Sequence, residues 1–266
     1  MSTATAEVNT FDLTQVERIP FSRLVRIELR KSYDTRAGWW LLASMGLLTV
    51  IIYVVMLLMV AFGSSHFSYG QYVAGAAFGT AVLLPIMGIL LVTSEWSQRT
   101  AMTTFSLEPN RFRVILAKLS TGLVLTAAVA AFALVAGAVV TLLNTAVGGG
   151  TSWDLGWKLL IGFLLTQAMA MLSGFALATL LLNSPAAIVG FFLYKWVVPT
   201  VLAVVAMNLH GFRHVQPWID FQNAQEPLRE LTLHGDQWAH LLVTGMVWLV
   251  VPFVLGLRRV LRAEVK

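Results

Sequence analysis

Six apolar runs of about twenty residues each constrain the fold more than any other feature of this chain. They cover roughly 39–62, 72–93, 119–143, 158–182, 186–207 and 238–257. A helix needs about twenty apolar residues to cross a bilayer. The composition agrees, because 58% of the residues are hydrophobic and only 12% are charged, against about 25% charged in soluble domains. The sequence therefore predicts an all-α, polytopic membrane protein with six transmembrane helices.

The basic residues are distributed unevenly between the two sides of these predicted spans. Fourteen lysines and arginines lie before the first run, between the second and third, or after the sixth, and the opposite loops hold two. Cytoplasmic loops carry the excess of such cations, so both termini are predicted to be cytoplasmic, in a cell (plasma or inner) membrane. Residues 1–38 then form a cytoplasmic tail and an interfacial helix, and residues 39–266 form the transmembrane domain.

The segment before the first run has the pattern of an amphipathic helix. At 100° per residue, one face carries Phe21, Leu24, Val25 and Leu29 and the other Arg23, Arg26, Arg30 and Lys31. Such a helix lies in the membrane interface and is attracted to anionic lipid. Glu28 falls within the apolar face. It either pairs with Lys31 or reaches water, or it makes a specific contact with the polar segment between the second and third spans.

That polar segment, the cytoplasmic loop 94–118, does not have the composition of an ordinary loop. From Glu95 to Leu107 it contains no Gly or Pro and repeats apolar residues, which indicates a short helix. Pro109 ends this helix, because the residue before a proline is driven out of the α conformation. Asn110 can cap the helix that follows. The sequence predicts a short helix on the inner membrane face, a turn, and a long helix re-entering the bilayer.

Residues of this loop match a family pattern at several positions: Glu95, Trp96, Thr100, Thr104, Pro109, Arg111, Ala117 and Lys118. With these residues, the loop 94–118 resembles the loop between the second and third spans of ATP-binding-cassette (ABC) exporter permeases of the second type. Two positions depart from the pattern, with Ser97 in place of the usual Arg and Arg99 in place of the usual Gly.

The resemblance implies that this loop is a coupling helix that docks on a separate ABC ATPase subunit. The residues expected to couple the two are Glu95, Trp96, Phe105, Leu107, Glu108, Pro109 and Arg111, with Glu28 and Lys31 in contact from the interfacial helix. Phe105 and Leu107 would pack in a groove of the partner, and Glu108 and Arg111 would fix the register.

The same resemblance implies the function and the assembly. The chain would export a substrate such as a drug, a peptide or a lipid-linked molecule by alternating access. It would act as a homodimer, or as a heterodimer with a similar permease, within the lipid membrane. ATP and Mg would bind to the ATPase partner, so this chain would hold no cofactor, and no nucleic acid is expected as a partner.

Motifs for catalysis are absent from the sequence. There is no GxxxxGK[ST] phosphate loop, no HExxH and no GxSxG, so no catalytic residue is expected. The histidines, His66, His210, His214, His234 and His240, all lie on the predicted outer side, and His210 and His214 are four residues apart. Such a pair could bind a metal. The alternative is therefore a membrane-embedded metal-handling protein or enzyme, although we expect no metal site.

Two further features are predicted to belong to a transport path. Lys195 lies near the middle of the fifth span, where a cation costs about 2.5–3.5 kcal/mol. It either reaches water or stacks on Tyr194 or Trp196, or it lines a translocation cavity, where it attracts an anionic substrate group or pairs with a partner such as Gln167. The outer segment 208–237 is too polar to span, but it is too apolar to lie free in water. Pro217 and Pro227 predict two short helices that re-enter the membrane. Trp218 and Phe221 would form a gate there, or the segment would be a passive cap.

Overall fold

The computed structural model describes residues 19–63, 65–98, 100–147, 150 and 152–262, and these residues form helices and loops without a strand. Six helices are long and apolar enough to cross a membrane: Arg36–Phe62, Tyr69–Ser97, Arg111–Ala146, Trp157–Leu181, Ser184–Asn208 and Asp236–Arg262. The prediction of an all-α, polytopic protein with six spans is confirmed. The predicted tail through residue 18 and the departure at Arg99 lie outside the described residues.

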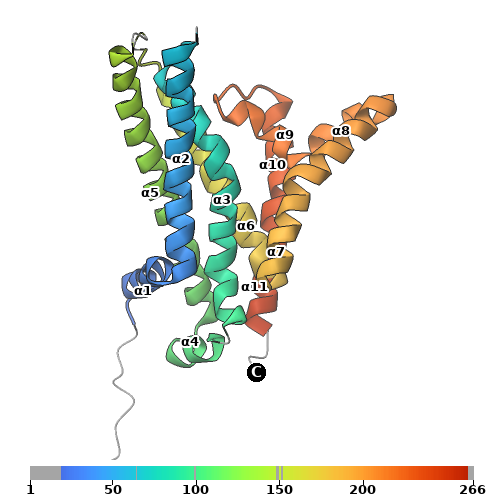
Figure 1. The fold of residues 1–266 in the computed structure, drawn as a ribbon. Helices are drawn as coiled ribbons and strands as arrows, with labels where there is room; N and C mark the ends of the chain where they lie inside the picture. Colours follow the sequence, from blue (N-terminus) through green and yellow to red (C-terminus); the bar gives the residue numbers. More distant parts are fainter. Residues whose placement is uncertain (1–18, 64, 99, 148–149, 151, 263–266) are drawn as a thin grey trace, which may run out of the picture.

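The centre of the fold is a pair of helices whose backbones touch, α3 (Tyr69–Ser97) and α6 (Trp157–Leu181). A Cβ atom added at Gly174 would lie 2.1 Å from the carbonyl oxygen of Pro85, and one at Gly88 would lie 2.5 Å from that of Met171. Small residues let membrane helices approach this closely. Outside the pair, α2 (Arg36–Phe62) and α5 (Arg111–Ala146) run side by side with α3 (Figure 1).

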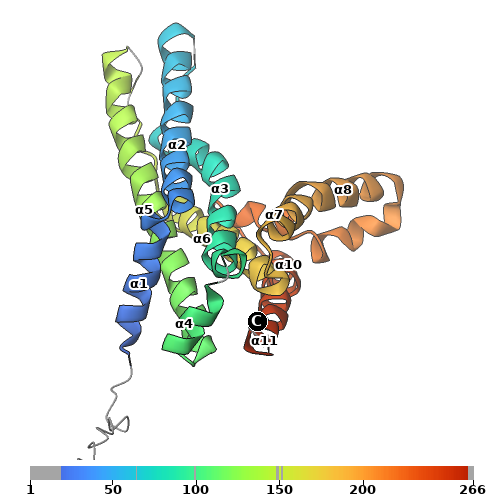
Figure 2. The same cartoon turned by 60° about the horizontal axis from the view of Figure 1, so that its bottom comes forward.

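The fifth and sixth spans are each interrupted by a π-helical stretch. In the fifth, Leu193–Val197 joins α7 (Ser184–Phe192) to α8 (Val198–Asn208). In the sixth, Met246–Val250 joins α10 (Asp236–Gly245) to α11 (Val251–Arg262). Each stretch ends two residues before a proline, Pro199 or Pro252, which cannot donate a helical hydrogen bond. Figures 1 and 2 show α8 leaning away from α3.

The segment between these spans forms four short helical turns rather than the predicted two helices. They are η3 (His210–His214), η4 (Gln216–Trp218), α9 (Phe221–Ala224) and η5 (Glu226–Leu228). Pro217 and Pro227 each lie in the first turn of a 3-10 helix, so each proline starts a turn rather than separating two longer helices. The segment packs on α8 and α10. It also reaches α6, where a Cβ at Gly162 would lie 2.1 Å from the Arg229 carbonyl oxygen.

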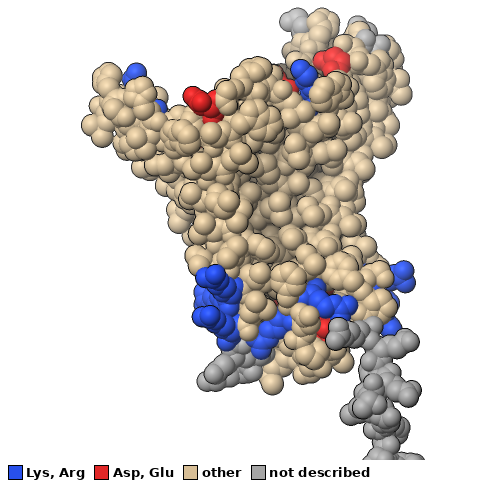
Figure 3. All heavy atoms as spheres, turned by 180° about the vertical axis from the view of Figure 1, so that it is seen from behind, with Lys and Arg blue, Asp and Glu red and all other residues tan. Residues whose placement is uncertain are grey.

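Two shorter helices, α1 (Phe21–Asp34) and α4 (Ala101–Leu107), lie at the same end of the bundle (Figure 1). Lysines and arginines gather at this end, which we call the basic end (Figure 3). The short helix was predicted to begin at Glu95, but the corresponding helix α4 begins at Ala101, because α3 continues through Ser97. Glu95 and Trp96 therefore belong to the last turn of α3. The predicted cap is confirmed, since the Asn110 side chain accepts a hydrogen bond from the Arg113 N–H at 3.2 Å.

Candidate functional site

Four charged side chains from three helices meet at the basic end of the bundle. Lys118 of α5 contacts Glu28 Oε2 at 2.6 Å and Glu95 Oε1 at 3.1 Å. Lys31 of α1 contacts Glu28 Oε1 at 2.7 Å and Glu95 Oε1 at 2.9 Å. We call these four residues the charge cluster. Glu28 makes both of the contacts that the sequence left as alternatives, one with Lys31 and one with the segment that ends at Lys118.

The charge cluster is mostly shielded from water. Glu28, Glu95 and Lys118 are buried, while the side chain of Lys31 is about half exposed. A buried charge is tolerated when it is paired and hydrogen-bonded, and each carboxylate here meets two ammonium groups. Burial acts to lower the pKa of Lys31, but the Glu28 and Glu95 carboxylates outweigh it and hold that pKa above its ordinary value. The cluster is therefore a clamp of paired side chains that joins α1, α3 and α5.

The short helix α4 is fastened to the same clamp. The Thr104 hydroxyl donates a hydrogen bond to Glu95 Oε1 at 3.0 Å. The ring of Phe105 packs against that of Trp96, with 6.4 Å between centroids. One polar and one aromatic contact thus connect α4 to the end of α3. The outward face of α4 carries Met102 and Leu107, which are 54% and 72% exposed.

Five of the predicted coupling residues have partners within the chain: Glu95 and Trp96, described above, and Phe105, Glu108 and Arg111. Phe105 packs inward against Trp96, and the Arg111 guanidinium lies 4.9 Å from the centroid of the Phe105 ring. Arg111 also donates to the carbonyl oxygen of Val260, at the end of α11, at 2.9 Å. Glu108 is buried and pairs with Arg113 at 3.0 Å. Phe105, Glu108 and Arg111 thus have partners within the chain, while the predicted coupling residues Leu107 and Pro109 are exposed. Their docking on an ATPase stays a prediction.

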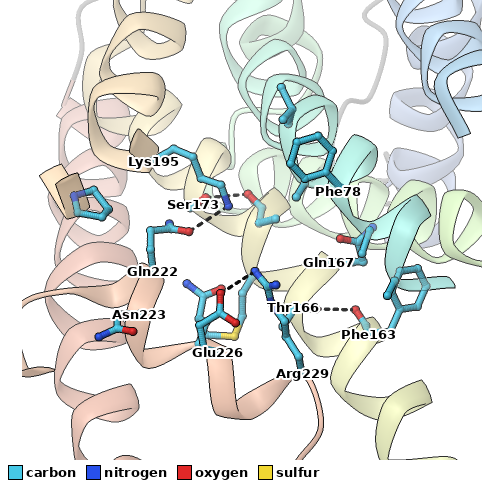
Figure 4. A pocket seen from close by; sticks show the side chains of 18 of the residues that line it. Phe78, Phe163, Thr166, Gln167, Ser173, Lys195, Gln222, Asn223, Glu226 and Arg229 are labelled. Atoms are coloured by element: carbon cyan, nitrogen blue, oxygen red, sulfur yellow. Dashed lines mark hydrogen bonds and ion pairs between the residues drawn. The ribbon is translucent and has the colours of Figure 1, made fainter. Parts of the chain in front are cut away.

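A second candidate site is a cavity of about 940 Å³ beside α3 and α6. Its walls come from these two helices, from the fifth span and from the segment η4–η5. Lys195 and Gln167 both line it, as predicted, but they do not pair. Lys195 donates to Gln222 Oε1 at 3.0 Å (Figure 4). Gln167 is buried and donates instead to the Thr80 hydroxyl across the α3–α6 contact.

The predicted gate residues lie outside this cavity. Phe221 is buried against α10, where its ring is the nearest group to a Cβ built at Gly245. The Trp218 ring lies edge-on to His240 of α10, with 4.5 Å between centroids. Both rings fasten the segment to the sixth span. The residues of this segment that line the cavity are polar ones that the sequence did not single out: Gln216, Asp220, Gln222, Asn223, Gln225, Glu226, Arg229 and Glu230.

The histidines do not form a metal site within the described part of the chain. No group of three or more His, Cys, Asp or Glu side chains that could hold a metal ion occurs there. His210 and His214 lie on the 3-10 turn η3, and both are exposed. His240 contacts Trp218.

Comparison of the chain with models of known protein families found no match, and comparison with curated proteins found none either.

Proposed function

We propose that this chain is the permease subunit of an ABC exporter of the second type. In this proposal it moves a substrate outward by alternating access, and a separate ABC ATPase that binds ATP and Mg supplies the energy. The basic end faces the cytoplasm, as the excess of lysines and arginines favours, and both termini lie there, in the plasma or inner membrane. The active unit is a dimer with a second copy or with a similar permease.

The observation that carries the proposal is the arrangement of α4. This helix projects at the basic end of the bundle (Figure 1), and its Met102 and Leu107 are 54% and 72% exposed. A contiguous exposed apolar patch marks a contact with another protein or with the membrane, and we assign this face of α4 to a protein partner. At the same time, α4 is held to α3 through Thr104 and Phe105. It therefore has an outward face for a partner and an inward face that can transmit force.

The path of that force follows the contacts. A push on α4 reaches Glu95 through Thr104, and the charge cluster passes it to α1 and α5. Because α3 and α6 touch through their backbones, they move together. The fifth span packs less closely against the rest of the chain, since only 11% of its most apolar stretch is buried. Closure of the ATPases would thus move the α3–α6 wall of the cavity against the fifth span as a rigid body.

Replacing both Met102 and Leu107 with aspartate is expected to abolish association with the ATPase. The new carboxylates would have to be desolvated in an apolar contact, which costs far more than the contact gains. We expect ATPase activity that copurifies with the tagged chain from its native membrane to fall at least about tenfold, which corresponds to about 1.4 kcal/mol. Mass spectrometry of the parent preparation identifies the copurified ATPase, whose sequence should contain a phosphate-binding loop.

The matched control is Phe62→Asp, which places the same charge at an exposed apolar residue of α2. This variant should keep the ATPase, and all variants should retain the thermal unfolding temperature of the parent chain. If the double aspartate variant still copurifies with the parent amount of ATPase, or if no ATPase accompanies the parent chain, the proposed coupling role of α4 is wrong.

A further inference from the structure

The cavity beside α3 has two chemically different walls. One is mainly apolar and is formed by α3 and α6, where residues such as Ala74, Phe78, Val82 and Phe163 outnumber the polar Thr166, Gln167 and Ser173. Phe78 lies within a predicted span, in the first half of α3, and is 80% exposed. The facing wall is polar and includes Lys195 and Gln222, which lie opposite Phe78 and Phe163 in Figure 4. A ligand that fills the cavity must therefore be apolar along one side and polar at one point.

Lys195 is the charged group of the polar wall whose bonding is incomplete. An ammonium group has three donors, and the one hydrogen bond that Lys195 makes goes to the neutral oxygen of Gln222. No carboxylate of the described residues lies within ion-pair distance of it. The charges that act on it are Arg229, which repels it, and Glu226, which already pairs with Arg229 at 3.1 Å. Lys195 thus keeps free donors at a site that favours an added anion.

A second unsatisfied group lies next to Lys195. Tyr194 lines the same cavity, but its hydroxyl oxygen is buried and makes no hydrogen bond of standard geometry with the described residues, although the Gln222 amide lies near it. A buried hydroxyl without a partner costs about 1–3 kcal/mol. Because the Tyr194 oxygen has almost no accessible surface, a ligand in the cavity meets the Lys195 ammonium and not this hydroxyl.

The other carboxylates of the cavity are accounted for. Asp220 is buried and caps α9, since it accepts from the Asn223 N–H at 3.1 Å. Glu230 lies at the exposed rim of the segment. Neither of them pairs with Lys195. The formal charges of the five charged lining residues sum to a negative value. Of the two cations among them, however, Lys195 is the one that makes no ion pair with a carboxylate of the described residues, and it lies opposite Phe78 (Figure 4).

We propose that this cavity binds an anionic amphiphile. The carboxylate or phosphate head accepts hydrogen bonds from the Lys195 ammonium, and the apolar tail lies along the α3 wall at Phe78. The assignment names the substrate class of the proposed exporter and rests on that function. The binding itself requires only this chain, so it can be tested without an ATPase.

The test uses the full chain in phosphatidylcholine nanodiscs and the fluorescence of a dansyl-labelled fatty acid, with empty nanodiscs subtracted. Competition by lauric acid, lauryl phosphate, methyl laurate and inorganic phosphate is then compared. We expect both anionic amphiphiles to compete at least about tenfold better than methyl laurate, because hydrogen bonds to charged groups are the strong ones. The ratio between lauric acid and lauryl phosphate shows which head the site prefers. Inorganic phosphate should not compete.

Lys195→Met should remove the advantage of the anionic head and leave methyl laurate binding unchanged. Phe78→Ala, at an exposed side chain, should weaken the acid and the ester alike. Lys158→Met is the matched control, since Lys158 is exposed outside the cavity, and it should bind as the parent does. If Lys195→Met does not fold, the comparison of acid with ester on the parent chain and on Lys195→Arg decides.

Three results would overturn the proposal: equal competition by lauric acid and methyl laurate, an unchanged preference in Lys195→Met, or displacement of the probe by inorganic phosphate. These results leave the exporter proposal standing with a different substrate. Conversely, loss of the ATPase association leaves the binding result intact.

Discussion

Replacing Lys118 with methionine is expected to lower the free energy of unfolding by about 3–5 kcal/mol, the usual cost of removing one partner of a buried ion pair. Lys118 is 2% exposed and bridges Glu28 and Glu95. Without it, two buried carboxylates would share the half-exposed Lys31. The neutral side chain is itself cheaper to bury, so the loss comes from the carboxylates it leaves behind. Reversible unfolding in mixed micelles measures the difference.

Two further variants separate charge from packing. Lys158→Met makes the same change at an exposed lysine and should alter stability by less than about 0.5 kcal/mol. Adding Glu28→Gln to Lys118→Met removes one of the stranded carboxylates and should recover part of the loss, which a double-mutant cycle quantifies. A loss below about 1 kcal/mol for Lys118→Met would show that the charge cluster does not hold the basic end together.

Replacing Gly174 with alanine is expected to separate the two central helices. The added Cβ would lie 2.1 Å from the carbonyl oxygen of Pro85, and that oxygen belongs to a helix backbone that cannot turn aside. Overpacking usually costs about 1–3 kcal/mol. Here the whole α3–α6 contact must open, so we expect about 3 kcal/mol or more. The variant should unfold at a markedly lower temperature or fail to accumulate in the membrane.

Gly46→Ala in α2 provides the matched control. The nearest atom to its Cβ would be a ring carbon of Phe132 at 3.8 Å, an ordinary contact. Alanine is favoured over glycine in a helix by about 1 kcal/mol, so this variant should be as stable as the parent or slightly more so. If Gly174→Ala and Gly46→Ala unfold at the same temperature, the α3–α6 contact is looser than the structure shows.

The six spans could be predicted from the sequence because each depends on a local property, the length of an apolar run. The Asn110 cap could be predicted for the same reason, since a cap is read within one turn. The charge cluster could be predicted only in part. Glu28 was conspicuous on an apolar face, but its partner Lys118 is 90 residues away, and nothing local in the sequence selects that lysine.

Candidate site residues were missed where the choice depended on tertiary packing. On a helix as short as α4, the sequence does not show which side faces the bundle, and Trp96 decides it by taking Phe105 inward. Gln222 and Tyr194 carry no motif, and only the cavity brings them together with Lys195. A signal was available for Lys195 because a cation in an apolar run is costly. Phe221, an apolar residue in a polar outer segment, was predicted to be part of a gate, but it is a buried core residue.

The π-helical stretches before Pro199 and Pro252 have a consequence for comparing this chain with others. A π turn closes its hydrogen bond one residue later than an α turn, so each stretch acts as a single-residue insertion. Positions on its two sides are out of phase by about 100° on a regular helical wheel. A homologue with uninterrupted α-helices would therefore align with the fifth and sixth spans only across a one-residue gap in each. Without those gaps, its cavity-facing positions after residue 197 would be matched to lipid-facing ones.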